Sequence, residues 1–182
     1  MERMNKEEVA ILANGCFWCT EAIFQQLKGV ASVRSGYTGG HIINPAYREV
    51  ITGSTGHAEG IEIVFNPEVI SFTEILEVFF STHDPTTLNR QGYDVGTQYR
   101  SGIFYKSETQ KSIAEGLIKA LDEAKVFNDP IVTEVTEFKN FFVAEEYHQN
   151  YYNNNKNQPY CLAVINPKLE KFLKDHKDKL KK

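Results

Sequence analysis

Residues 9–27, VAILANGCFWCTEAIFQQL, contain the most informative pattern in this chain. The stretch opens with a continuous apolar run that predicts a strand and closes with a segment that predicts a helix. The motif GCFWC, residues 15–19, lies at the junction. Helix N-termini carry unsatisfied N–H groups and a partial positive charge, which favour a thiolate over a thiol. We therefore predict a reactive cysteine, Cys16, beside an apolar surface formed by Phe17 and Trp18.

The elements predicted outside this stretch complete an α+β pattern. Strands are expected at residues 9–13, 30–36, 57–65, 101–105 and 131–138. Helices are expected at residues 18–27, after the capping pair Ser71 and Glu74, at 107–125, at 144–153 and at the Lys-rich end of the chain. Because strands and helices do not alternate strictly, we predict an α+β fold with helices packed against a mixed or antiparallel sheet.

Length and composition limit the class of protein. The 182 residues, 41% hydrophobic and 24% charged, fit a single soluble domain, residues 1–182, with its core at about 9–168. The net charge of −4 does not indicate binding to nucleic acid or to a membrane surface. No signal peptide or membrane-spanning run is evident, so we expect a cytoplasmic protein. Residues 168–182 are interpreted as a solvated helix.

The three cysteines, Cys16, Cys19 and Cys161, are too few and odd in number for a secreted disulfide scaffold. Cys19 has three interpretations: the partner of Cys16 in a redox CxxC pair, half of a zinc site, or a small apolar helix residue. With no second CxxC or H-x3–5-H pattern, the zinc signal is weak, and we expect no metal. Cys161 lies in a predicted proline-containing loop, which suits a thiol that must reach Cys16.

Glu59 is the most informative carboxylate. In the predicted strand 57–65 it shares a face with Ile61, Ile63 and Phe65. An apolar environment disfavours the charged carboxylate and raises its pKa. Glu59 is therefore a candidate proton donor at neutral pH, unless it lies at the strand end and reaches water.

Two tyrosines and one aspartate lie in turn-like contexts. Tyr37 is in GYTGG, residues 36–40, and Tyr99 is in GTQYRS, residues 96–101. Their hydroxyls can hydrogen-bond a polar substrate atom. Asp94 precedes the second turn and is interpreted either as a residue that orients substrate or as a cap.

Six short motifs resemble, in order and spacing, the signatures of the A-type peptide-methionine sulfoxide reductases. They are GCFW (15–18), GYTGG (36–40), GHAE (56–59), HDPT (83–86), GTQYRS (96–101) and AEEYHQ (144–149). The resemblance covers roughly residues 9–168. It implies an α+β fold, a two-layer sandwich with a ferredoxin-like mixed sheet and packed helices. It also implies an enzyme that reduces the S-epimer of methionine sulfoxide, free or in proteins, in the repair of oxidised proteins.

The resemblance also implies a chemical function for each candidate. Cys16 attacks the sulfoxide sulfur, and Glu59 protonates the sulfoxide oxygen. Tyr37 and Tyr99 hydrogen-bond that oxygen. The products are methionine and a sulfenic acid on Cys16.

The remaining candidates form the implied substrate pocket. Phe17 and Trp18 enclose the S-methyl group, and Asp94 helps to orient the substrate. The opposite epimer exchanges oxygen and methyl, leaving buried polar groups unsatisfied at a cost of ~1–3 kcal/mol each.

The implied cycle closes with a second thiol and an external reductant. Many family members have glycine at the position of Cys19, and both Cys161 and Cys19 resemble known types of resolving thiol. We favour Cys161, and a relay through both thiols stays open. A dithiol such as thioredoxin then regenerates the enzyme, with no bound cofactor. We expect a monomer.

Two other functions compete with this interpretation. A general thiol–disulfide oxidoreductase explains the Cys16–Cys19 pair but gives Glu59 no function. The second alternative is a non-enzymatic zinc-binding or interaction module, which predicts one bound zinc and a Cys16 that thiol reagents do not reach.

Overall fold

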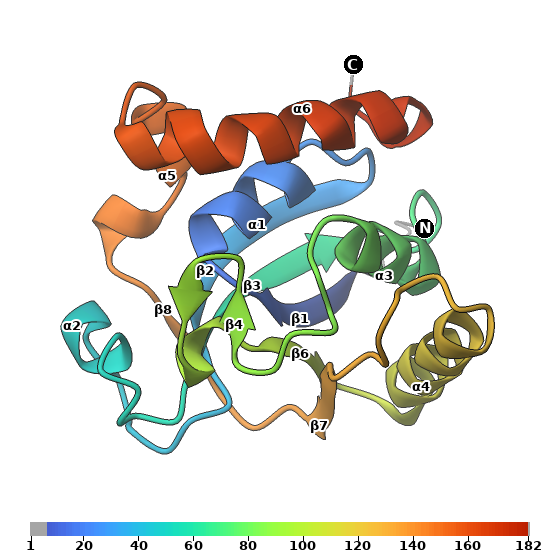
Figure 1. Cartoon of the computed structure of the whole chain (residues 1–182), viewed down its shortest axis with the longest axis horizontal. Helices are drawn as coiled ribbons and strands as arrows, with labels where there is room; N and C mark the ends of the chain where they lie inside the picture. Colours follow the sequence, from blue (N-terminus) through green and yellow to red (C-terminus); the bar gives the residue numbers. More distant parts are fainter. Residues whose placement is uncertain (1–6, 182) are drawn as a thin grey trace, which may run out of the picture.

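A six-stranded mixed sheet forms the centre of the computed structural model, which describes residues 7–181 (Figure 1). Its strands are β1 (Glu8–Asn14), β2 (Val30–Thr38), β3 (Ala58–Phe65), β6 (Ser101–Tyr105), β7 (Glu134–Glu137) and β8 (Phe141–Val143). They lie in the order β7-β6-β1-β3-β2-β8. The β6–β7 pair is parallel, and the other neighbouring pairs of this sheet are antiparallel.

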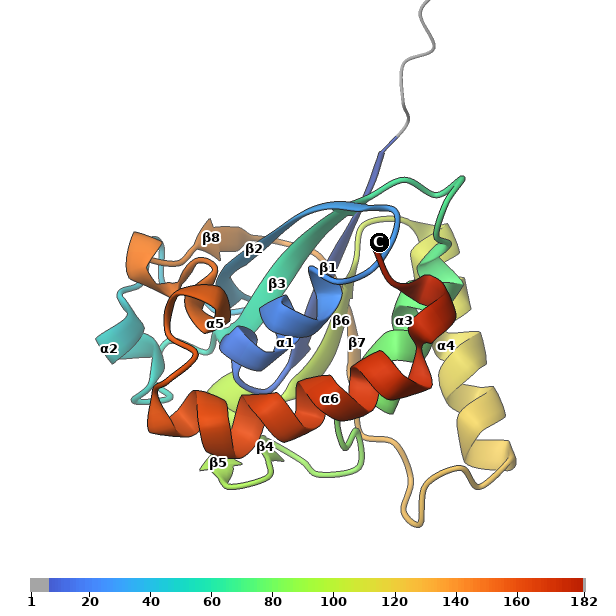
Figure 2. The same ribbon diagram turned by 90° about the horizontal axis from the view of Figure 1, so that it is seen from above.

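The helices complete the predicted ferredoxin-like arrangement. The main helices are α1 (Phe17–Phe24), α3 (Phe72–Ser81), α4 (Glu108–Glu123) and α6 (Asn166–Asp175), and the single-turn helices are α2 (Tyr47–Val50) and α5 (Tyr151–Asn154). The chain runs β1-α1-β2-β3-α3-β6, and these strands pair as β6-β1-β3-β2, which is the βαββαβ topology. Helix α6 packs on α1, farther from the sheet (Figures 1 and 2).

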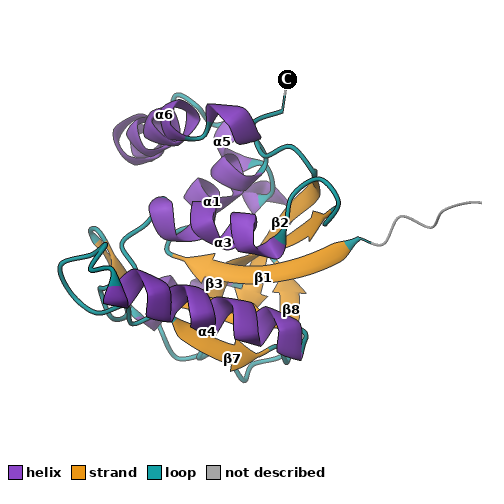
Figure 3. Cartoon of the chain, turned by 90° about the vertical axis from the view of Figure 1, so that its right-hand side faces the viewer, coloured by secondary structure: helices purple, strands orange, loops and turns teal. Residues whose placement is uncertain are grey.

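The period-two alternation of the strands divides the core between the two faces of the sheet. Leu12, Ile61 and Ile63 face the larger cluster, which the helices cover. Ile11 and Ala13 face a smaller cluster on the other side. Figure 3 shows α1 and α3 on the same side of β1.

Serine side chains cap the starts of α3, as predicted, and of α4. Ser71 and Glu74 form a reciprocal capping box: the Glu74 N–H donates to Ser71 Oγ at 3.0 Å, and the Ser71 N–H donates to Glu74 Oε1 at 3.2 Å. Ser107 Oγ accepts the N–H of Gln110 at 3.2 Å at the start of α4. No helix within residues 7–181 has the length and apolarity needed to cross a bilayer.

The single helix expected at residues 144–153 is wrong. A 3₁₀ turn, Glu146–His148, is followed by α5, and between them Asn150 has φ +55°. A left-handed residue ends the hydrogen-bond ladder of a right-handed helix, so two short turns form instead. The short strand β8, just before this segment, was not expected.

Three other local expectations are also corrected. Tyr37 lies inside β2 rather than in a loop. Cys161 starts a π-helical turn, Cys161–Ile165, that continues into α6, and is not in a loop. The C-terminal helix starts at Asn166, ends at Asp175, and is not simply a solvated face, because it buries Leu169 and Phe172.

Candidate active site

Cys16 occupies the N-cap of α1, directly after β1, where the sequence placed it. The turn depends on Gly15, whose φ is +108° and whose missing Cβ leaves room for Gln91, at 2.9 Å from the position a Cβ would take. The Cys16 carbonyl accepts the N–H groups of Cys19 and Thr20 at 3.2 and 3.4 Å. The half-buried Cys16 side chain is thus fixed at the start of the helix.

The expectation that the helix N-terminus acidifies Cys16 is corrected. Burial raises the pKa of this thiol well above its ordinary value, and Cys19 and Glu59 raise it further. A hydrogen bond from the Trp18 N–H lowers the pKa but does not compensate. Desolvation therefore outweighs the dipole of a two-turn helix, and resting Cys16 is protonated.

Cys19, buried one turn later, is the more acidic thiol of the pair. The hydrogen bond from Cys16 lowers the pKa of Cys19, burial opposes this effect, and Lys168 and Tyr160 lower the pKa further. Cys19 Sγ lies 3.9 Å from the Tyr160 hydroxyl. Cys19 is therefore the thiol of the pair that ionises more readily.

Cys161 packs against Cys19 in one apolar cluster, which Cys16 also contacts. Its pKa is raised, first by burial and then by Cys19. All three thiols are free. The structure thus brings the three predicted thiols together, with Cys19 interacting with both of the others.

Glu59 confirms the prediction from strand alternation. The side chain on β3 is 2% exposed, and Oε1 accepts the Phe17 N–H at 3.2 Å. Burial raises the pKa of Glu59 to about 8, Phe17 lowers it in part, and Asp94 and Cys19 raise it. The carboxyl group is therefore mostly protonated at neutral pH.

Tyr99 and Tyr47, rather than Tyr99 and Tyr37, flank Glu59 with available hydroxyls. Burial raises the pKa of both Tyr47 and Tyr99, with Glu59 as the next cause. Neither hydroxyl has a hydrogen-bond partner within residues 7–181. The Tyr37 ring is fully buried, and its hydroxyl already donates to Glu145 Oε1 at 2.8 Å.

The sequence does not predict Tyr47 as a site residue, because α2 is a single turn with no periodic pattern. Its position depends on the same carboxylate that binds Tyr37, since the Tyr47 N–H donates to Glu145 Oε2 at 2.9 Å. Glu145 was likewise not singled out. The GYTGG and AEEYHQ motifs therefore meet at one carboxylate.

Phe17 and Trp18 form an aromatic wall beside Cys16. The Trp18 Nε1–H donates to His148 Nδ1 at 3.0 Å, and the indole stacks on Tyr151 with ring centroids 3.8 Å apart. Phe17 is buried, with its ring 5.1 Å from His148. Two turns far along the chain therefore hold the indole.

Asp94 lies on a small hairpin formed by β4 (Arg90–Gln91) and β5 (Asp94–Val95). Its Oδ2 accepts the hydroxyl of Tyr160 at 2.9 Å. Tyr160, also missed, precedes Cys161. Asp94 thus joins the hairpin to the segment that carries the third thiol.

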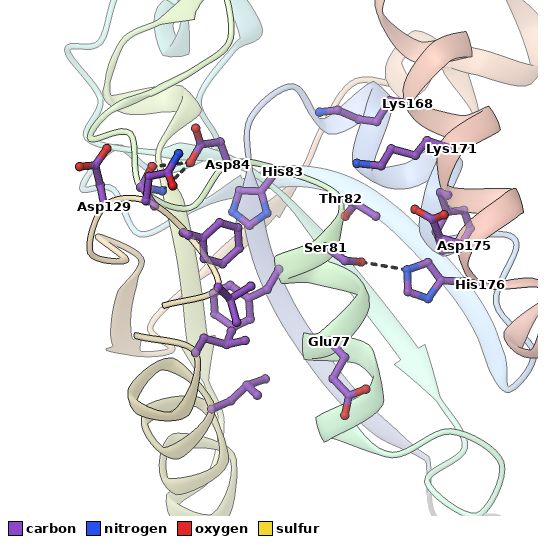
Figure 4. A pocket seen from close by; sticks show the side chains of 18 of the residues that line it. Glu77, Ser81, Thr82, His83, Asp84, Asp129, Lys168, Lys171, Asp175 and His176 are labelled. Atoms are coloured by element: carbon purple, nitrogen blue, oxygen red, sulfur yellow. Dashed lines mark hydrogen bonds between the residues drawn. The ribbon is translucent and has the colours of Figure 1, made fainter. Parts of the chain in front are cut away.

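A cleft of about 890 Å³ lies elsewhere, between α3, α4 and α6 (Figure 4). Lys168 and Lys171 line one wall, and His176 Nε2 is hydrogen-bonded to Ser81 at 2.9 Å. None of the predicted catalytic side chains lines this cleft. Within the described part of the chain, no three His, Cys, Asp or Glu side chains cluster so as to hold a metal ion.

Comparison with known proteins places this geometry in a family. Residues 8–181 match the family model described as peptide methionine sulfoxide reductase. The chain is 56% identical over 172 residues to peptide methionine sulfoxide reductase MsrA of Sulfolobus acidocaldarius, covering 94% of this chain and 97% of that one. It is 53% identical over 175 residues to MsrA of Deinococcus radiodurans, covering 96% and 85%.

Solved structures agree with the sequence relatives. Reduced Mxr1 from Saccharomyces cerevisiae has a TM-score of 0.77 and 34% identity, covering 88% of this chain and 92% of that one. Mxr1 in complex with Trx2 has a TM-score of 0.54 and 26% identity, covering 83% and 88%. The shared topology and these identities establish that the chain belongs to the A-type branch of the peptide methionine sulfoxide reductase family.

Proposed function

We propose that this protein reduces the S-epimer of methionine sulfoxide, free or in proteins, through a sulfenic acid on Cys16. The observation that carries the proposal is the buried Glu59 carboxyl group, held protonated and hydrogen-bonded to the residue next to Cys16. A protonated acid beside a thiol is what deoxygenation of a sulfoxide requires, because oxide is a poor leaving group until it is protonated.

The reductive step begins when Glu59 donates its proton to the sulfoxide oxygen. Protonation draws electron density from the substrate sulfur, and the partial positive charge there favours ionisation of the Cys16 thiol. The Cys16 thiol gives its proton to the Glu59 carboxylate, and Cys16 Sγ attacks the substrate sulfur. The sulfur–oxygen bond of the substrate breaks, the hydroxyl group passes to Cys16 Sγ, and the transient sulfur–sulfur bond breaks to release the thioether. One thiol and one sulfoxide give one sulfenic acid and one thioether, with cysteine oxidised and substrate reduced.

The pocket explains selectivity for one epimer. Tyr47 and Tyr99 hold the oxygen beside Glu59, which revises the sequence expectation of Tyr37 and Tyr99. Phe17 and Trp18 receive the S-methyl group, and Asp94 contributes to substrate orientation. The other epimer places oxygen against the aromatic rings, and each unsatisfied polar group then costs ~1–3 kcal/mol.

We assign the first resolving step to Cys19 rather than Cys161. Cys19 carries the lowered pKa and interacts directly with Cys16. Cys19 Sγ attacks the sulfenic sulfur of Cys16, the sulfur–oxygen bond breaks, and the Cys16–Cys19 disulfide forms. The thiol proton of Cys19 leaves with the hydroxyl group as water. Cys161, which packs against Cys19, then attacks Cys19 Sγ in that disulfide. A Cys19–Cys161 disulfide forms and the Cys16 thiol is released.

A dithiol protein such as thioredoxin supplies the electrons for the last step, and no bound cofactor takes part. The complex of the related Mxr1 with Trx2 supports this choice of reductant. We place the enzyme in the cytoplasm as a monomer that repairs proteins under oxidative stress.

The test is turnover on separated sulfoxide epimers, with wild type and Glu59→Gln and with a chemical dithiol as reductant. Wild type is expected to consume the S-epimer alone, and Glu59→Gln to bind it but react far more slowly. Reduction of insulin disulfides with no reaction on either epimer contradicts the proposal and favours a general thiol–disulfide oxidoreductase.

A further inference from the structure

The helix that presents Cys16 also buries a second carboxylate, Glu21, that the reaction above does not use. Its side chain is 1% exposed. Carboxylates are rarely buried without partners, because removing the charge from water is strongly unfavourable. The hydrogen-bond partners of Glu21 therefore indicate why a carboxylate is buried at this position.

Glu21 binds the backbone of a distant turn. The Tyr151 N–H donates to Glu21 Oε1 at 3.2 Å, and the neighbouring Asn150 N–H lies close enough to lower the pKa of the same carboxyl group. Burial raises the pKa of Glu21, whereas these two N–H groups lower it. The buried Ser35 hydroxyl has no hydrogen-bond partner within residues 7–181. It nevertheless lies close enough to Glu21 to lower the pKa of that carboxyl group.

The turn suits a carboxylate because of its backbone conformation. Asn150 has φ +55°, and a left-handed residue in a turn aligns successive N–H groups into an anion-binding concavity. Here the anion is a side chain of α1. The bond joins residues 130 positions apart in the sequence.

This turn holds the aromatic wall of the site. Tyr151 stacks on Trp18 at 3.8 Å, and His148, just before the turn, accepts the indole N–H at 3.0 Å. Trp18 and Glu21 are three residues apart on α1 and so occupy neighbouring helix positions. Trp18, Tyr151 and Glu21 thus form a closed ring of contacts between α1 and residues 148–151.

We propose that Glu21 is a positioning residue that fixes the Trp18 wall of the substrate pocket by anchoring the Asn150–Tyr151 turn. The inference rests on the proposed function insofar as Trp18 receives the substrate methyl group. The anchoring itself does not depend on turnover.

Trp18 is the chain's one tryptophan, so its fluorescence reports directly on the wall. We expect Glu21→Ala to shift the emission to longer wavelength, to increase quenching by acrylamide, and to raise KM for methionine (S)-sulfoxide roughly tenfold. The rate constant at saturation is expected to fall less than KM rises. Glu21→Gln keeps one acceptor oxygen for the turn and is expected to restore most of the wild-type emission and KM.

Gln110→Ala is the matched control. Gln110 is also buried and also bonds distant backbone, accepting the Lys106 N–H and donating to the Val9 carbonyl at 2.9 Å each. It lies on α4, outside the contacts described for Trp18. Its loss is expected to lower the unfolding temperature without changing Trp18 emission or KM.

If folded Glu21→Ala shows the same Trp18 emission and the same KM as wild type, the proposal is overturned, and Glu21 contributes only to stability. If Glu21→Ala does not fold, Glu21→Gln is compared with Glu21→Asp, which shortens the side chain. Identical emission, quenching and KM in those two variants also overturn it. Failure of the proposed function gives a different result. In that case the wild-type protein does not reduce the sulfoxide, but Glu21→Ala still differs from wild type in Trp18 fluorescence.

Discussion

The Phe17 N–H donates to Glu59 Oε1 at 3.2 Å, so the acid on β3 is tied to the residue that follows the nucleophile on α1. Both elements belong to the βαββαβ core, and neither partner lies on a loop. The relative position of acid and thiol is therefore set by the packing of a helix on a sheet. Such sites hold their geometry more closely than sites built on loops.

Glu59→Gln tests the proton donor while preserving shape and the bond from Phe17. An amide cannot donate a proton to a leaving oxygen, and loss of general-acid catalysis typically costs about 10²- to 10⁴-fold in rate. We expect a fall of that order in the single-turnover release of methionine at pH 7, measured by rapid quench. Equal rates for variant and wild type contradict the assignment.

The same substitution is expected to stabilise the fold at high pH. The folded-state pKa of Glu59 is about 8, whereas an unfolded glutamate titrates near ~4.3. Between these values the folded state holds the extra proton, so wild-type stability falls as the pH rises from about 4.3 to about 8. Glu59→Gln does not titrate and avoids this loss.

Urea unfolding at pH 5 and pH 9 measures the effect. The free energy of unfolding of Glu59→Gln relative to wild type is expected to improve by roughly 2–4 kcal/mol between these pH values. Glu62→Gln, on the same strand but paired with Arg34 in an exposed salt bridge, is the control and is expected to show a much smaller change. A pH-independent difference for Glu59→Gln argues against the raised pKa.

Tyr47→Phe and Tyr37→Phe separate the two candidate oxygen donors. Removing a donor that binds developing negative charge costs about 10²- to 10³-fold in rate, and we expect Tyr47→Phe to approach this loss. Tyr37→Phe breaks its bond to Glu145 and is expected to cost about 1 kcal/mol in unfolding free energy, with a smaller kinetic effect. Steady-state kinetics and thermal unfolding of both variants make the comparison, and the reverse ranking of rates contradicts it.

Cys19→Ser and Cys161→Ser separate the resolving steps. Without Cys19, the sulfenic acid on Cys16 lacks its adjacent thiol, and we expect one methionine per enzyme followed by a stall in the presence of thioredoxin. Cys161→Ser is expected to form the Cys16–Cys19 disulfide and to continue when a small dithiol is supplied. Mass spectrometry of the oxidised variants identifies the disulfides. Normal recycling by Cys19→Ser together with a stall in Cys161→Ser supports the original preference for Cys161.

Regular elements were predictable because their signals are local. Alternation along β3 placed Glu59 on the apolar face, and serine caps fixed the starts of α3 and α4. The junction of β1 and α1 at Cys16 followed from the change of hydrophobic pattern. These features depend on neighbouring residues only.

What sequence reasoning missed depends on contacts far apart in the chain. Tyr47 joins the site through Glu145, 98 positions away, and no local period marks either residue. The π-helical start at Cys161 is held by packing against α1, which a proline-containing loop pattern does not reveal. The pKa of Cys16 was misjudged because the helix dipole is visible in the sequence, whereas the depth of burial is not.

The central claim is that Glu59 must be protonated for Cys16 to take the oxygen, and the pH dependence of single-turnover methionine release tests it most directly. We predict that the wild-type rate constant on methionine (S)-sulfoxide falls above about pH 8, as Glu59 loses its proton, and that the residual rate of Glu59→Gln lacks this descending limb. A wild-type rate that rises steadily through pH 9, or a descending limb shared by both proteins, contradicts the account.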